Sequence, residues 1–230
     1  MRLGLSALSA ALVAVVGTAN AAIIVQYPTA GSVTSLAAEI VDPSVTADDL
    51  TAGSGLAVNT FSTFNFDGYD TDNTSFADAV ADDEVFLWGF DVTSPVTIDL
   101  TTFDIRPDRS GTGPDDFEIQ VSVNGGAGIS VLSFDFGDST SGVDFIGVDL
   151  SAVPTLSQGD SVVFTLAAFN SESTAGSFDL ETVDFGGSDP RAIRIEGDIT
   201  ASVIPEPGAA LLAMLGMTFL GAVGMRTKLG

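Results

Sequence analysis

Residues 117–136, FEIQVSVNGGAGISVLSFDF, decide the fold class of this chain. Apolar and polar side chains alternate through residues 117–123, which is the period of a strand with one buried face. Residues 124–128, NGGAG, follow, and Asn and Gly tolerate the left-handed backbone of a tight turn. Alternation then returns in residues 129–136. The stretch therefore predicts a β-hairpin.

The same alternation recurs through the middle of the chain and predicts more strands. Residues 84–92 (EVFLWGFDV) and 96–105 (VTIDLTTFDI) are expected to form a second strand pair around residues 93–95. The apolar phase of 96–105 changes after Leu100, which predicts a bulge. Further strands are expected at residues 22–27, 60–66, 143–150, 161–169, 177–185 and 191–199.

One stretch breaks the strand rhythm. Residues 75–82, SFADAVAD, begin with Ser75, a favourable N-cap, and predict a short helix. The remainder of residues 22–202 predicts an all-β exported domain, a β-sandwich of two sheets. A jelly-roll-like topology is favoured over an immunoglobulin fold, because about ten candidate strands exceed the seven of the simplest immunoglobulin type and no Cys-Trp-Cys pattern is present.

Acidic residues dominate the charge of the chain. It has 31 Asp and Glu against 7 Lys and Arg, a net charge of −24, and all acids except Glu206 lie in the middle region. Such a surface repels nucleic acid, so no nucleic-acid partner is expected. The chain has no His and no Cys, which removes disulfides, the commonest metal ligand and the usual partner of a nucleophilic Ser or Cys.

The N-terminus has the pattern of a secretory signal peptide. Arg2 precedes an uncharged apolar run, and small residues at 19–21 (Ala-Asn-Ala) resemble a cleavage site. Residues 1–21 are therefore predicted to be a signal peptide, cleaved near Ala21 or Ala22.

The C-terminus has the pattern of a membrane anchor. Residues 208–225 carry no charge, and about 20 apolar residues cross a bilayer core. Arg226 and Lys228 follow at once, so they are the expected stop-transfer residues and should stay in the cytoplasm. Residues 208–225 are thus predicted to be a transmembrane helix.

A proline-rich strip lies in front of this helix. Pro205 and Pro207 keep the backbone extended around Glu206. Together with the apolar run and the short basic end, residues 203–230 resemble a PEP-CTERM sorting signal. The resemblance implies recognition of Pro205, Glu206 and Pro207 by an exosortase in a Gram-negative bacterium that makes exopolysaccharide. The basic end, RTKLG, is shorter than the usual arginine-rich tail.

Two middle segments, residues 45–56 (VTADDLTAGSGL) and 104–126, also resemble ectodomains that accompany this sorting signal. This second resemblance implies the sandwich fold and no activity.

The densest polar cluster is DGYDTDN, with Asp67, Asp70, Asp72 and Asn73. Calcium takes six to eight oxygen ligands, so this loop is the calcium candidate of the sequence, although it lacks the EF-hand spacing. A solvated acidic loop is the alternative. No other metal and no cofactor is expected.

Trp88, the only tryptophan, is the carbohydrate candidate. It alternates with Phe86 and Phe90 along one strand face. An exposed face would be a platform for sugar stacking, whereas a buried face would belong to the core.

Paired carboxylates are the only catalytic groups that this composition offers, and a glycoside hydrolase needs two of them about 5–9.5 Å apart. No pair is distinguished in the sequence. Arg106 and Arg109 stand among aspartates and are expected to form local ion pairs.

The favoured function is a non-enzymatic exported protein of the cell surface or of an extracellular exopolysaccharide or biofilm matrix. An exosortase would process it after a period of inner-membrane anchoring, and exopolysaccharide would be a partner. The alternatives are a carbohydrate-binding module or adhesin that uses the Trp88 face, and a secreted carboxylate-based hydrolase.

Overall fold

The computed structural model describes residues 21–28, 33–59, 63–181 and 193–201. The chain divides into two compact units, residues 1–200 and 201–230, and Ala201 is the only described residue of the second. The described residues consist mostly of antiparallel strands with a short helix, so the expected all-β class is confirmed.

The described strands form three sheets, which we call A, B and C. Sheet B has seven strands in the order β12-β11-β15-β8-β5-β2, with β4 also paired to β8. Sheet A has six, in the order β13-β9-β17-β1-β3, with β14 beside β9. Sheet C has four, in the order β10-β16-β7-β6.

The bounds of these strands, in chain order within each sheet, are as follows. Sheet A contains β1 (Ala21–Tyr27), β3 (Ile40–Val41), β9 (Val96–Ile105), β13 (Phe145–Asp149), β14 (Leu156–Ser157) and β17 (Ile193–Ala201). Sheet B contains β2 (Ser35–Leu36), β4 (Val45–Ala47), β5 (Leu50–Ala52), β8 (Val85–Val92), β11 (Pro114–Val123), β12 (Ile129–Asp135) and β15 (Ser161–Ser171). Sheet C contains β6 (Ala57–Val58), β7 (Phe64–Asp67), β10 (Pro107–Arg109) and β16 (Phe178–Leu180).

The hairpin predicted from residues 117–136 is confirmed, because β11 pairs with β12 in antiparallel register. At the turn Asn124 and Gly125 have φ of 54° and 67°. The amide of Gly126 donates to the carbonyl oxygen of Val123 at 2.9 Å. A turn with two left-handed central residues matches the right-handed twist of its strands, which explains the Asn-Gly sequence.

The side chain of Asn124 links this turn to the start of β15, the neighbour of β11 in sheet B. Its Nδ2 donates to Asp160 Oδ1 at 2.7 Å, and its Oδ1 accepts from the amide of Ser161 at 2.9 Å. Both heteroatoms of the amide side chain are therefore occupied.

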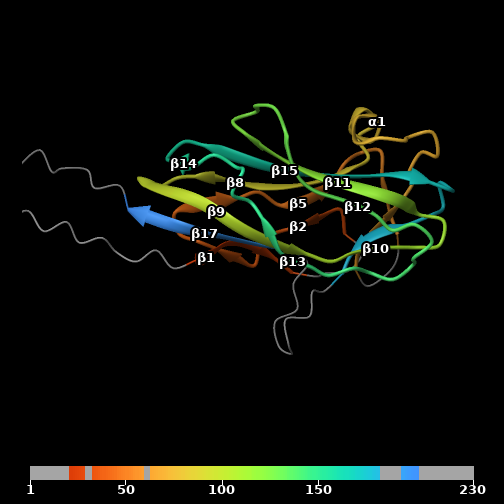
Figure 1. The fold of residues 1–230 in the computed structure, drawn as a ribbon, viewed down its shortest axis with the longest axis horizontal. Helices are drawn as coiled ribbons and strands as arrows, with labels where there is room; N and C mark the ends of the chain where they lie inside the picture. The colour runs from red at the N-terminus through yellow and green to blue at the C-terminus, as the bar shows by residue number, and fades with distance from the viewer. Residues whose placement is uncertain (1–20, 29–32, 60–62, 182–192, 202–230) are drawn as a thin grey trace, which may run out of the picture. The chain divides into compact units, whose positions relative to one another are not determined.

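Sheet B packs face to face against sheets A and C. Ring contacts join Phe164 of β15 to Phe103 of sheet A at 6.1 Å, and Phe117 of β11 to Phe178 of sheet C at 5.8 Å. Only Arg106 separates β9 of sheet A from β10 of sheet C, so those two sheets form one layer. The long strands of both layers run in the same general direction (Figure 1).

The helix α1 (Phe76–Ala81) confirms the predicted helix and its cap. Ser75 is the N-cap, and its side chain accepts from the amide of Asp78 at 3.3 Å. Ala79 packs with Val85 and Ala167 in a small cluster separate from the main core. The helix therefore lies against sheet B through contacts with β8 and β15.

The predicted pairing of residues 84–92 with 96–105 is wrong. These residues form β8 and β9, but β8 belongs to sheet B and β9 to sheet A. The chain crosses between layers at residues 93–95 instead of turning back in one sheet. Within β9 the change of apolar phase is confirmed, since Ile98 and Leu100 are buried and then Phe103 and Ile105.

The other strand predictions are confirmed to different extents. Strands β1, β13, β15 and β17 match the expected segments closely, whereas β7 and β16 cover only parts of residues 60–66 and 177–185, whose remaining residues include undescribed ones. The sequence prediction missed the short strands β2, β3, β4, β5, β6, β10 and β14.

None of the helical structure in the described ranges is long and apolar enough to span a membrane. The transmembrane helix predicted at residues 208–225 lies outside the described residues, and so do Pro205, Glu206, Pro207, Arg226 and Lys228. Of the predicted signal peptide only Ala21 is described, as the first residue of β1.

Candidate functional site

The register of sheet C brings three polar side chains into one row. Asp108 of β10 lies directly opposite Asp179 of β16, and Asp179 lies opposite Asn65 of β7. Their strand neighbours Phe178 and Leu180 are fully buried in the core. Because side chains alternate between the two faces of a strand, the three polar groups share the opposite face of the sheet.

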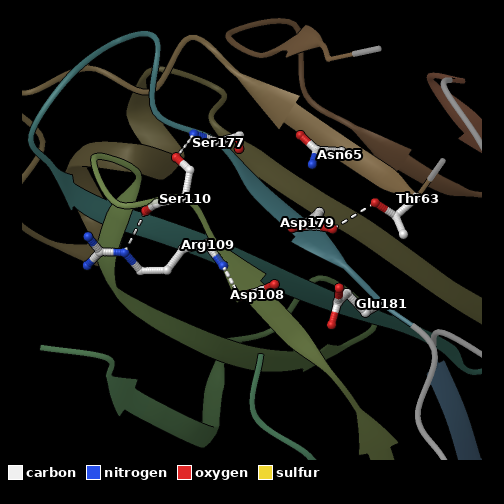
Figure 2. A pocket seen from close by; sticks show the side chains of 8 residues that line it. All are labelled: Thr63, Asn65, Asp108, Arg109, Ser110, Ser177, Asp179 and Glu181. Atoms are coloured by element: carbon white, nitrogen blue, oxygen red, sulfur yellow. Dashed lines mark hydrogen bonds between the residues drawn. The ribbon is translucent and has the colours of Figure 1, made fainter. Parts of the chain in front are cut away.

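A pocket of about 280 Å³ opens over this row (Figure 2). It is lined by Thr63, Asn65, Asp108, Arg109, Ser110, Ser177, Asp179 and Glu181. Asp179 and Asn65 are only 8% and 6% exposed, although they line it. All the lining side chains are polar or charged, and three of them, Asp108, Asp179 and Glu181, are acidic.

Hydrogen bonds within the wall hold two of these carboxylates. Thr63 Oγ1 donates to Asp179 Oδ2 at 2.7 Å, and the backbone amide of Arg109 donates to Asp108 Oδ1 at 2.8 Å. Asn65 Oδ1 is buried and has no hydrogen-bond partner. A buried carbonyl oxygen without a donor costs about 1–3 kcal/mol.

Burial perturbs both acids of the row. Desolvation raises the pKa of Asp179 to about 6, the hydrogen bond from Thr63 opposes the rise, and the charges of Asp108 and Glu181 add to it. Burial likewise raises the pKa of Asp108 above its ordinary value, against the hydrogen bond from the Arg109 amide. Like charges directly opposite each other on neighbouring strands repel. At Asp108 the charge of Glu181 adds to the rise in pKa and the charge of Arg106 opposes it.

The two arginines near the pocket are engaged elsewhere. Arg106 Nε donates to Glu181 Oε2 and its Nη1 to Asp144 Oδ1, both at 2.8 Å. Figure 2 shows the guanidinium of Arg109 directed away from Asp108 and Asp179. The predicted local ion pair is confirmed for Arg109, which pairs with Asp115, whereas Arg106 pairs with Asp144 and Glu181, which lie far from it in sequence.

Arg109 is a structural residue. It is 4% exposed, and its guanidinium donates to the carbonyl oxygens of Ser110, Gly111 and Gly137 at 3.0, 3.2 and 3.1 Å and also pairs with Asp115. A buried guanidinium needs several acceptors, and this set supplies them. Arg109 therefore fixes the loop that follows β10.

The predicted calcium loop is organised differently. Asp70 and Asp72 are exposed, and the amide of Asp72 donates to Asp70 Oδ1 at 2.9 Å. Glu84, which is buried, accepts from the Asp70 amide at 2.8 Å and from Asn73 Nδ2 at 2.9 Å. The Asp70 amide and Asn73 Nδ2 are thus paired with Glu84, and the Asp72 amide with Asp70, whereas the buried Tyr69 OH has no partner.

Asp67, the third residue of that prediction, is half-buried at the end of β7. In the described ranges no three or more His, Cys, Asp or Glu side chains are grouped so that they could hold a metal ion. The structure therefore does not bring Asp67, Asp70 and Asp72 together as a ligand set.

Trp88 is part of the core. It is 1% exposed and stacks on Phe164 of the neighbouring strand, with ring centroids 5.5 Å apart and an angle of 14° between the planes. Phe86 and Phe90 on the same face are also buried. In this structure Trp88 presents no open ring face, so of the two alternatives for this strand face the core position is the one observed.

Sequence reasoning missed Asp108, Asp179 and Asn65 as a group. Each is a polar residue between apolar or buried neighbours, in the stretches PDR, FDL and FNF. That local pattern could have marked them as residues on the second face of a strand. Their common row depends on long-range strand register, which the sequence does not display.

No protein-family model, curated protein or solved structure matches this chain.

Proposed function

We propose that this chain is a non-enzymatic exported protein that an exosortase sorts to the cell surface or to an extracellular exopolysaccharide matrix. One observation carries the proposal, namely the order of segments in residues 203–230. Pro205, Glu206 and Pro207 precede the uncharged run 208–225, and Arg226 and Lys228 follow it. The signal-like residues 1–21 add the export step that this route requires.

For the exported domain, residues 22–202, we propose a jelly-roll-like β-sandwich. The support is the packing of sheet B against the layer of sheets A and C, through contacts such as Phe117 with Phe178. The crossing from β8 to β9 between layers agrees with the non-hairpin connections of Greek-key sandwiches. All acids of the chain except Glu206 lie in this domain, and their negative charge would keep it soluble and repel it from acidic polymers unless divalent cations bridge them.

The two alternatives fare differently. A carbohydrate-binding module built on Trp88 finds no support, because that ring is in the core. A carboxylate-based hydrolase has Asp108 and Asp179 as its support, because burial raises the pKa of both and general acid–base catalysis uses such pairs. We favour the non-enzymatic function because, among the described residues, no aromatic side chain lines the pocket to hold a sugar ring beside the pair.

Mass spectrometry of the two ends of the natural product tests the sorting proposal. The full chain would be expressed in a Gram-negative bacterium that has an exosortase, and in the same strain without the exosortase. We expect loss of about the first 21 residues in both strains. We expect loss of the segment after residue 205 only where the exosortase is present.

A matched pair of variants makes this test specific. Glu206→Ala removes the carboxylate of the motif and should leave the C-terminus intact, whereas Glu196→Ala in β17 should be cut like the natural chain. Recovery of the chain from the cytosol with both ends intact would refute the proposal. Cleavage that is unaffected by Glu206→Ala would refute the role of the motif.

The hydrolase alternative has its own test. The chain would be incubated with the exopolysaccharide of the host, and released sugar ends would be measured for the natural chain and for Asp179→Asn. We expect no release by either protein. Turnover by the natural chain that disappears in Asp179→Asn would replace our proposal with the hydrolase.

A further inference from the structure

We propose that the peptidase which removes residues 1–21 must cut before β17 pairs with β1, because that pairing encloses the bond between Ala21 and Ala22. The inference rests on the signal peptide of the proposed function and adds an order to two steps, the cut and the closure of sheet A. It does not depend on what happens at the C-terminus.

The first argument is the place of the bond in sheet A. β1 begins at Ala21, so the last residue of the predicted signal peptide is already a strand residue. Ala21 lies opposite Asp198 of β17, and Ala22 lies opposite Gly197. A peptidase must bind the residues on both sides of a bond as a separate extended chain, so paired residues must first leave the sheet. Pairing with β17 therefore withholds this bond.

Close packing behind the bond opposes local opening. β17 is an inner strand of sheet A, between β9 and β1. Gly197 is buried, and a Cβ atom there would lie 2.8 Å from the carbonyl oxygen of Asp99 in β9 and 3.4 Å from Cγ1 of Ile24. Ile24 itself is fully buried, two residues after Ala22. The sheet therefore holds the chain firmly on the carboxyl side of the bond.

The other neighbour of β1 leaves the bond free. β3 pairs with β1 only at Val25 and Gln26, and the amide of Asp42 donates to the carbonyl oxygen of Ile24 at 2.9 Å. Within the described ranges, residues 21–23 have β17 as their only strand partner. Access to the bond is therefore controlled by β17 alone.

The order of strands along the chain supplies the time for the cut. β17 begins at Ile193, 172 positions after Ala21, and it is the last strand of the described residues. Synthesis at about 5–20 residues per second separates these two positions by about 10–30 s when export keeps pace. During this interval β1 can pair with β3 but not with β17, so the bond stays open. A chain that completed sheet A first would keep residues 1–21.

An order-of-addition experiment on the purified full chain in mild detergent tests the proposal. The chain is unfolded in urea and diluted into refolding buffer. A purified bacterial signal peptidase is added either at once or after refolding, which is followed by the fluorescence of buried Trp88. We expect a cut between Ala21 and Ala22 when the peptidase is present from the start. After refolding we expect the rate of cutting to be at least about tenfold lower.

Two insertions of the same four residues, Gly-Ser-Gly-Ser, locate the protection. Between Ala21 and Ala22 the insertion moves the bond after Ala21 about 13 Å along the chain from β1, so both orders of addition should give equally fast cutting. Between Gly125 and Gly126, in the exposed turn of the β11–β12 hairpin, it should leave the refolded chain as resistant as the natural one. Urea unfolding followed by Trp88 fluorescence verifies that both variants fold.

Each other outcome overturns the inference. Equal cutting of the natural chain in both orders would show that the paired bond is accessible, while the signal peptide itself would stand. Slow cutting of the refolded chain with the insertion after Ala21 would place the protection outside the pairing of β1 with β17. A natural product that begins ahead of Ala21, read by mass spectrometry, would move the bond out of β1. Failure to cut any chain in either order would refute the signal peptide of the proposed function, and this inference with it.

Discussion

The chain has two concentrations of acidic groups, the loop of residues 67–73 and the row of Asp108 and Asp179 on sheet C. In the loop the donors are neighbours in sequence, and the buried Glu84 accepts from the Asp70 amide and from Asn73. In the row the acids come from strands far apart in sequence, and the adjacent Asn65 Oδ1 has no donor. The carboxylate of Glu84 is thus paired within the loop region, whereas Tyr69 OH of the loop and Asn65 Oδ1 beside the row are both buried without a partner.

This difference shows why the density of Asp in a sequence is a poor guide to a cation site. Closely spaced loop residues reach one another's amides and satisfy them locally, as Asp70 and Asp72 do. Residues on separate strands are held at a fixed spacing by the sheet and cannot collapse onto each other.

The largest expected effect concerns the arginine that supports the row. Arg109→Met should destabilise the domain by about 3–5 kcal/mol, because three carbonyl oxygens and Asp115 would lose their buried partner. Denaturant unfolding followed by Trp88 fluorescence measures the change. A loss below about 1 kcal/mol would mean that these carbonyls find other donors.

Removal of Glu84, which supports the loop of residues 67–73, should destabilise the domain less than removal of Arg109. Glu84→Ala should destabilise the domain by about 2–3 kcal/mol, because the Asp70 amide and Asn73 Nδ2 lose their acceptor. Relief of the desolvation that raises the pKa of Glu84 offsets part of the loss. Hydrogen exchange should show faster exchange of the Asp70 amide with sheet C unchanged. Slower exchange, or an effect that spreads to sheet C, would contradict the separation of the two regions.

For the row of Asp108 and Asp179 we expect a substitution to increase the free energy of unfolding instead of lowering it. In calcium-free buffer at pH 7, Asp179→Asn should stabilise the domain by about 1–2 kcal/mol. The pKa of Asp179 rises from 3.8 to about 6 on folding, which corresponds to about 3 kcal/mol against the charged form, and a weaker hydrogen bond from Thr63 reduces the gain.

The pH dependence of this gain checks its cause. Below about pH 3.8 the carboxyl is protonated in both states, so Asp179→Asn and the natural chain should be equally stable. As pH rises to about 6 the unfolded chain releases its proton first, so the natural chain loses stability and the difference grows to its full value. A difference that is constant from pH 3.5 to 7 would exclude this explanation.

The smallest effect belongs to the exposed end of the loop. Asp72→Asn should change the free energy of unfolding by less than about 0.5 kcal/mol, because its carboxylate is exposed and makes no hydrogen bond within the described residues. The same unfolding measurement applies. A larger decrease in the free energy of unfolding would show that the Asp72 carboxylate stabilises the domain, which would contradict the contrast between the loop and the row.

Local patterns predicted much of the fold. The Asn-Gly turn between β11 and β12, the Ser75 cap of α1 and the phase change in β9 all follow from residues within about ten positions of one another. The pairing of β8 with β9 was wrong for the opposite reason. Their alternation predicts two strands correctly but does not specify the partner of either, and β8 pairs with β15, β4 and β5 instead.

The candidate site was less predictable than the fold. The calcium prediction rested on three aspartates that lie close together in sequence, Asp67, Asp70 and Asp72. Asp108 and Asp179 lie 71 positions apart and meet only because β10 pairs with β16 in this register. Register is set by packing of the whole sheet, for which a single sequence shows no signal. Trp88 is a second example of what one sequence leaves open. Its alternation with Phe86 and Phe90 predicts that the three side chains share one face of a strand, but it does not show whether that face is buried.

The Asn124 turn has a consequence for how long such a protein lasts. An asparagine followed by glycine is prone to cyclise onto the next amide nitrogen and to become aspartate or isoaspartate, a reaction that accumulates in proteins which are not resynthesised in place. Here Asn124 Nδ2 donates to Asp160, and Asn124 Oδ1 accepts from the Ser161 amide. These two hydrogen bonds hold the carboxamide away from the amide nitrogen of Gly125. The most age-sensitive dipeptide of this hairpin is thereby shielded from spontaneous chemical decay.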